Sequence, residues 1–144
     1  MKLSITLIAA LALAAVPAQA CRVMRSAFSR IAGAEQSGTI ASVAHVRIVA
    51  SRDLGRPVGD ANPWEATARV ERVVRGSNPI REVRFSQGWG SPACDLGYGR
   101  PQPGDAWVVY FWNHPEHGQQ VWEAFPFHVA EEVEGELRKQ HRAR

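Results

Sequence analysis

Apolar and polar residues alternate with a period of two over much of the chain after residue 40. This alternation is typical of strands that bury one face. It predicts a strand over Ala41–Ala50 and a second over Trp64–Val74. In the second strand the phase slips at Arg72 and Val73, which indicates a bulge and a coiled strand.

Three further strands are expected. Glu82–Ser86 forms the third, after the turn-forming residues 75–79. The nearly continuous apolar run Ala106–Trp112 is typical of a strand covered on both faces, and Gln120–His128 pairs back with it across a hairpin loop. A Gly- and Pro-rich connection, residues 87–105, separates the third strand from the fourth.

Helical patterns lie at the two ends of this strand-rich region. Val129–Gln140 is expected to be a helix with Val129, Val133 and Leu137 on one stripe. Ser26–Ala34 is a second, shorter helix candidate. Five strands, one long connection and a peripheral C-terminal helix predict an all-β fold, a five-stranded Greek-key barrel of the OB type.

The first twenty residues have the pattern of a secretory signal peptide. Lys2 supplies a positive start, Leu3–Val16 an apolar stretch, and residues 18–20 a small-x-small cleavage site. Cleavage there would leave residues 21–144 as the mature chain, a length that suits one domain. We therefore expect a secreted or periplasmic protein, and after cleavage no second apolar run is long enough to span a membrane.

Charge and motifs argue against several classes of function. The chain has seventeen basic and fourteen acidic side chains, a balance that disfavours a nucleic-acid-binding protein. The sequence contains no Gly-x-Ser-x-Gly motif, no His-Glu-x-x-His motif and no glycine-rich phosphate loop. The sequence thus predicts a monomer that is not an enzyme and needs no cofactor.

The chain has two cysteines, Cys21 and Cys94, and Cys21 would be the first residue of the mature protein. In an oxidising compartment an even pair normally forms a disulfide. This one would close a loop of about 74 residues, worth roughly 4 kcal/mol from chain entropy. Two unpaired thiols are one alternative. The other is lipid attachment at Cys21, although Ala18 stands where lipobox signals have a branched apolar residue.

Two further groups of residues are candidates for binding. His114 and His117 have metal-ligand side chains, but the sequence shows no third ligand nearby, so a solvated hairpin loop is the favoured interpretation. Trp89 lies between two glycines of the long connection. It is the best candidate for an exposed aromatic contact, or else for a plug over one end of the barrel. Three other tryptophans are expected in the core: Trp64, Trp107 and Trp112.

A series of motifs runs through the mature chain in a fixed order. They are Thr67-Ala68-Arg69-Val70-Glu71 leading to Arg75-Gly76, then Cys94-Asp95-Leu96-Gly97-Tyr98, then Pro103-Gly104-Asp105 before the fourth strand. This order resembles the inhibitory domain of the tissue inhibitors of metalloproteinases and the related netrin-like OB-fold modules. In that family the mature chain begins with a cysteine that is bonded to another on the connection before the fourth strand, and Cys21 and Cys94 occupy those places.

The resemblance implies a mechanism. In the family the terminal amine and the carbonyl of the first residue chelate the catalytic zinc of a protease, and the disulfide holds this tip rigid. The implied contact surface is Cys21, Arg22 and Val23, with the loop from Trp89 to Cys94 alongside. Val23 replaces the family's second cysteine, and Arg22 replaces the small residue that enters the specificity pocket of the protease. The expected partner is a zinc metalloprotease, or another envelope protein if the chain is an interaction protein without inhibitory activity.

Overall fold

The structure, a computed structural model, describes residues 26–55, 62–89, 98–135 and 137. All paired strands run antiparallel in one sheet of order β3-β2-β1-β4-β5. In the described part of the chain, no helix has the length and apolarity that crossing a membrane requires. The elements in chain order are α1 (Ala27–Gln36), β1 (Ser42–Asp53), β2 (Trp64–Gly76), β3 (Glu82–Gln87), β4 (Ala106–His114), β5 (Gly118–Pro126) and α2 (Phe127–Ala130).

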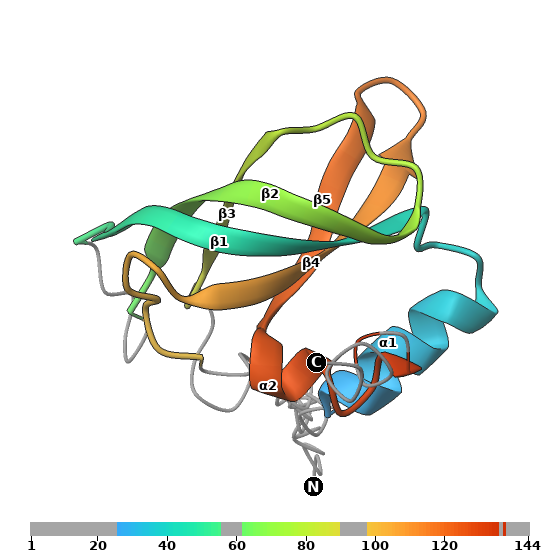
Figure 1. The fold of residues 1–144 in the computed structure, drawn as a ribbon, viewed down its shortest axis with the longest axis horizontal. Coiled ribbons are helices and arrows are strands. Elements are labelled where there is room, and N and C mark those ends of the chain that lie inside the picture. Colours follow the sequence, from blue (N-terminus) through green and yellow to red (C-terminus); the bar gives the residue numbers. More distant parts are fainter. Residues whose placement is uncertain (1–25, 56–61, 90–97, 136, 138–144) are drawn as a thin grey trace, which may run out of the picture.

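The predicted all-β class with five strands is confirmed, but the sheet is not closed. β3 and β5 are its two edge strands, so the likeness to an OB barrel is loose, although OB barrels are themselves partly open. The sheet nevertheless curls far enough for the edges to approach one another (Figure 1), and Gln87 Nε2 donates a hydrogen bond of 2.6 Å to the carbonyl oxygen of Ala124.

The curl comes from irregular pairing between β1 and β2. The register of this ladder shifts three times, and two of the shifts skip Glu71 and Val74 on β2. They bracket the phase slip expected at Arg72 and Val73, which is thereby confirmed. The third shift skips Val49 on β1. Bulges of this kind increase the local twist of the paired strands.

Both faces of the sheet bury apolar side chains. The inner, concave face holds one cluster, in which the Trp64 and Trp107 rings meet edge to face at 5.6 Å. Both residues are buried as predicted, whereas Trp112 is only half-buried and packs against His114. Figure 1 shows α1 and α2 together on one side of the sheet. They cover an outer cluster of Ala27, Ile31, Val43, Val108, Tyr110, Phe125, Ala130 and Leu137.

The N-terminal helix agrees with its prediction to within two residues. The backbone N–H of Ser29 donates to Ser26 Oγ at 3.3 Å, so Ser26 is the N-cap. Ala27, Ile31 and Ala34 form the buried stripe of α1, with the three- and four-residue spacing of one helix face.

The predictions for the C-terminal region were partly wrong. β5 was expected to continue to His128, but it ends at Pro126, which has no N–H to donate to a strand ladder. The helix was expected over Val129–Gln140, but α2 spans only Phe127–Ala130. Turn residues follow at 131–133, and the chain is helical again at Gly135 and Leu137. The predicted stripe still packs inward: Leu137 belongs to the outer cluster, and Val129 and Val133 pack against that cluster.

An ionic cluster ties the C-terminal segment to the sheet. Arg75 of β2 donates to the Glu134 carboxylate at 3.2 and 3.4 Å and also pairs with Glu35 of α1. Burial lowers the pKa of Arg75, but the bonds and charges of these two carboxylates outweigh it and the pKa is raised. Burial also raises the pKa of Tyr110, and the neighbouring Glu134 raises it further. The cluster therefore joins α1, β2, β4 and the C-terminal segment.

We predict that Glu134→Ala lowers the free energy of unfolding by about 2–3 kcal/mol, because it leaves a partly buried arginine without its principal partner. Urea denaturation measures the change. Glu35→Ala is the matched control: its side chain is 40% exposed, and loss of an exposed pair costs less than about 1 kcal/mol. Equal effects of the two variants would contradict the role given to Glu134.

Candidate functional site

Among the predicted contact residues, Trp89 is the one that lies in the described part of the chain. The residue is 58% exposed, so the expected exposure of this aromatic is confirmed. The indole Nε1 donates to Ser86 Oγ at 3.0 Å, so the ring is held beside the end of β3. A large aromatic side chain fixed by its polar end has the amphipathic character of residues enriched at protein interfaces.

Gly88 sets the direction in which the chain leaves β3. Its φ is 80°, and a Cβ on this residue would lie 2.4 Å from the carbonyl oxygen of Asn62 and 3.2 Å from Cα of Pro63. Only glycine fits such a position. The segment that leads into β2 therefore supports the exit from β3 and fixes where Trp89 emerges.

Tyr98 anchors the same end of the sheet from the other side of the long connection. Trp64, the first residue of β2, donates from Nε1 to the carbonyl oxygen of Tyr98 at 3.1 Å. The Tyr98 ring makes edge contacts with Trp107 at 6.2 Å and with Phe125 at 5.9 Å. It thus packs against both the inner and the outer cluster.

The start of α1 lies close to Tyr98. Burial raises the pKa of the Tyr98 hydroxyl, the charge of Glu123 raises it further, and the charge of Arg30 lowers it. Arg30, on α1, forms an ion pair with Glu123 of β5. Ala27, in the first turn of α1, belongs to the outer cluster against which Tyr98 packs. The first turns of α1 and Tyr98 therefore share one patch of the outer face.

Four predicted contact residues lie outside the described part of the chain: Cys21, Arg22, Val23 and Cys94. The disulfide expected between the two cysteines lies outside it as well. The nearest described anchors are Ser26, five residues after Cys21, and Tyr98, four residues after Cys94.

An open hollow of about 570 Å³ adjoins Tyr98 at the start of β4. This volume is in the range of small-ligand sites. At its edge Arg100 pairs with Asp53 of β1, at 3.5 Å. Sequence reasoning missed this hollow because its walls come from segments that only the fold brings together. Its lining comprises Tyr98, Gly99, Arg100, Pro101, Asp105, Ala106, Trp107, Pro126, Phe127 and His128.

His114 and His117 lie closer together than their hairpin position suggested. His114 ends β4, His117 lies in the turn before β5, and their rings stack with centroids 4.5 Å apart. The N–H of Glu116 donates to His114 Nδ1 at 3.1 Å. Within the described ranges no group of three potential metal ligands is present. The pair by itself would supply half of the four ligands of a structural zinc site.

The chain matches no protein-family model, no curated protein and no solved structure. One end of the sheet brings together the exposed Trp89, the packed Tyr98 and the hollow beside it.

We predict that Gly88→Ala destabilises the protein by about 1–3 kcal/mol, because the alanine would be held in a left-handed conformation against a backbone carbonyl. Gly99→Ala is the matched control, since nothing lies within 4 Å of a Cβ at that position. The midpoint of urea unfolding measures both changes. Equal stability of the two variants would show that Gly88 does not fix the exit from β3.

Proposed function

We propose that the protein is an exported, non-catalytic binding module. Its contact surface is the end of the sheet that carries Trp89, with the mature amino terminus at Cys21 beside it. The observation that carries this proposal is the exposed Trp89, held by Ser86 next to the place where Tyr98 and the start of α1 adjoin one cluster. Large aromatic residues of this kind are enriched among the residues that dominate binding energy.

In its sharpest form the proposal is inhibition of a zinc metalloprotease. The α-amine and carbonyl oxygen of Cys21 chelate the catalytic zinc, which keeps one coordination position open for water or substrate. A disulfide to Cys94 holds this tip on a rigid support and lowers the entropic cost of binding. Support comes from the anchors on both sides, because Ser26 caps a helix with a buried stripe and Tyr98 packs against both clusters.

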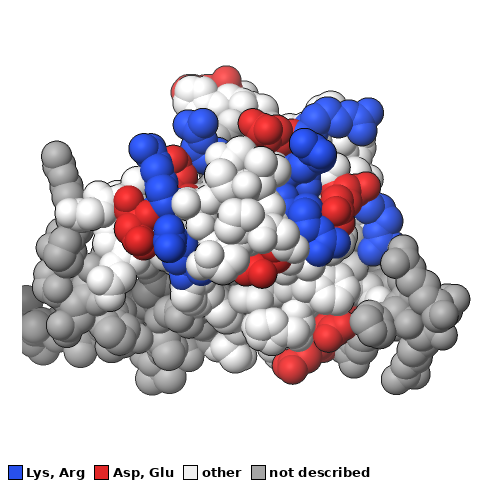
Figure 2. Space-filling view, turned by 60° about the vertical axis from the view of Figure 1, so that its left-hand side comes forward, with Lys and Arg blue, Asp and Glu red and all other residues white. Residues whose placement is uncertain are grey.

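The distribution of charge fits a protein partner. Figure 2 shows Lys and Arg side chains interspersed with Asp and Glu side chains around a large uncharged area. Nucleic-acid-binding surfaces are instead marked by clustered basic residues. A mixed surface of this kind gives no strong field of one sign, so contacts with a partner depend on shape and on local pairs.

Inhibition is tested with the mature protein and with a variant that has one additional alanine before Cys21. We expect the mature protein to inhibit at least one member of a panel of zinc proteases. The extended variant should lose at least 100-fold in affinity, or about 2.7 kcal/mol, because its first amine no longer lies next to the Cys21 carbonyl. Circular dichroism checks that both proteins fold alike. Equal inhibition by the two would contradict chelation.

Trp89→Ala provides the companion test of the contact surface. We expect it to weaken inhibition about tenfold, equivalent to about 1.4 kcal/mol. Its unfolding midpoint should change little, because the ring is mostly exposed. If neither Trp89→Ala nor the alanine extension alters binding of any protease, the contact surface is wrongly placed.

The chemical state of Cys21 is tested by the intact mass of the mature protein and by N-terminal sequencing. We expect an open terminus and a mass lighter by the two hydrogens lost in a disulfide. A diacylglyceryl increment with a blocked terminus would instead show a lipid-anchored envelope protein, because lipidation consumes the thiol and blocks the amine.

A further inference from the structure

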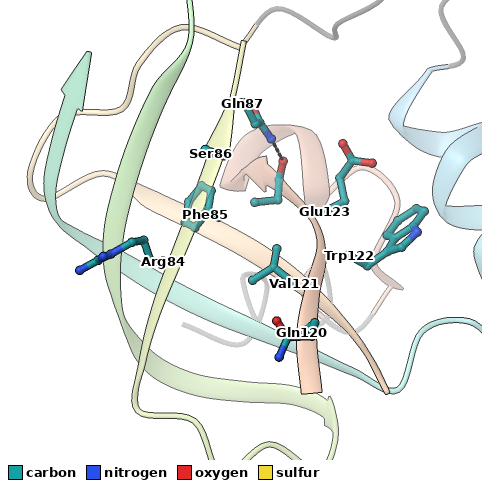
Figure 3. A pocket seen from close by; sticks show the side chains of 9 residues that line it. Arg84, Phe85, Ser86, Gln87, Gln120, Val121, Trp122 and Glu123 are labelled. Carbon is teal, nitrogen blue, oxygen red and sulfur yellow. Dashed lines mark hydrogen bonds between the residues drawn. The ribbon is translucent and has the colours of Figure 1, made fainter. Parts of the chain in front are cut away.

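The two edge strands of the sheet face one another across an open seam. β3 and β5 each pair on one side only, and between them lies a groove of about 350 Å³. Figure 3 shows that its walls are the two strands themselves, with the Gln87 side chain reaching across to the backbone of β5. The lining residues are Arg84, Phe85, Ser86 and Gln87 of β3 and Gln120, Val121, Trp122, Glu123 and Ala124 of β5.

The main chain of β3 presents unpaired groups to this seam. The N–H of Val70 donates to the carbonyl oxygen of Arg81 at the beginning of the β2–β3 ladder, whose register then continues without a shift. Hydrogen-bonded pairs alternate along an antiparallel ladder. The N–H and C=O groups of Arg84 and Ser86 therefore point away from β2 and into the seam. Exposed edges of this kind are templates for pairing with another strand.

One glutamine carboxamide bridges the seam, and a second joins β5 to the connection between β2 and β3. Gln87 Nε2 donates to the Ala124 carbonyl oxygen, and Gln119 Nε2 donates to the Ser77 carbonyl oxygen, each at 2.6 Å. A carboxamide has the donor and acceptor of a peptide group, so the Gln87 bridge imitates one peptide group of a missing strand. Oε1 of Gln87 is buried without a hydrogen-bond partner. Buried acceptors are costly when unpaired, and a backbone N–H placed in the seam would satisfy this one.

We propose that the seam between β3 and β5 binds an extended segment of a partner protein, which adds a sixth strand between the two edges. The strand directions are compatible with this insertion, because four successive antiparallel pairings leave β3 and β5 running in the same direction. One inserted strand then lies antiparallel to both. It requires the edges to be about 9.6 Å apart, whereas Cα atoms of β3 and β5 approach within 8 Å of one another, so the two edges move apart to admit the strand. Binding by strand addition draws affinity from main-chain hydrogen bonds.

The side chains around the seam indicate the chemistry of this segment. Figure 3 shows Phe85 and Val121 directed into the space between the strands and Arg84 directed away from it. Arg84 is exposed and forms no ion pair within the described ranges. Because side chains alternate along a strand, the segment carries apolar residues over Phe85 and Val121 and acidic residues on the side of Arg84. This inference does not depend on zinc chelation, since it is argued from described residues of β3 and β5 alone.

The probe is an acetylated and amidated peptide, Thr-Val-Glu-Val-Glu-Val-Thr, added to the mature protein. We expect saturable binding and slower hydrogen exchange at the N–H groups of Arg84 and Ser86, read by nuclear magnetic resonance. The control peptide has the same side chains but N-methyl groups on alternate residues, which remove the pairing N–H groups from one edge. We expect it to bind at least tenfold more weakly. Equal binding of the two peptides, or unchanged exchange at Arg84 and Ser86, would overturn the proposal.

Variants of Arg84 distinguish the contribution of its backbone N–H to peptide binding from that of its side-chain charge. Arg84→Pro removes an N–H that points into the seam but takes no bond from β2, and proline is tolerated on edge strands. It should weaken binding of the peptide at least tenfold, whereas Arg84→Ala, which keeps the N–H, should weaken it only about threefold. The N-methylated peptide still decides the question if Arg84→Pro fails to fold. A dimer that forms without peptide and is lost in Arg84→Pro would show that a second copy of the chain occupies the seam, and would refute a partner segment.

Discussion

The curl of the β1–β2 ladder is the constraint on which the rest of the structure depends. Three register shifts in one long antiparallel pair add twist, so the sheet wraps around the inner cluster instead of lying flat. The same curl carries β3 round toward β5, where the Gln87 side chain reaches the backbone of β5. It also gathers the exit of β3, the start of β2 and the start of β4 at one end of the sheet. Both proposed binding surfaces follow from this geometry.

The outer layer holds this curled sheet in place by apolar packing and one ionic cluster. α1 and the C-terminal segment cover the outer cluster, and Arg75 joins Glu35 and Glu134 across their boundary. Because Arg75 is partly buried, removal of a carboxylate partner leaves its charge uncompensated and weakens this docking. This packing fixes the position at which α1 starts.

The two proposed surfaces meet at the end of β3. Gln87 bridges the seam, Gly88 turns the chain, and Trp89 is held outside by Ser86. A partner strand paired with β3 would end beside the Trp89 ring. The exposed aromatic and the open edge therefore form one continuous surface, in which the aromatic supplies buried area and the edge supplies directed hydrogen bonds.

Short-range patterns in the sequence determined the strands, the cap of α1 at Ser26, the burial of Trp64 and the exposure of Trp89, because each depends on residues only a few positions away. The premature end of β5 at Pro126 was also readable, since proline cannot donate to a ladder. The stacked His114 and His117, the hollow beside Tyr98 and the seam between β3 and β5 were not readable from the sequence. These features depend on which distant strands pair and in what register. A period of two specifies that a strand has a buried face, but it does not specify its neighbour, so only the tertiary structure decided that β3 and β5 would face one another unpaired.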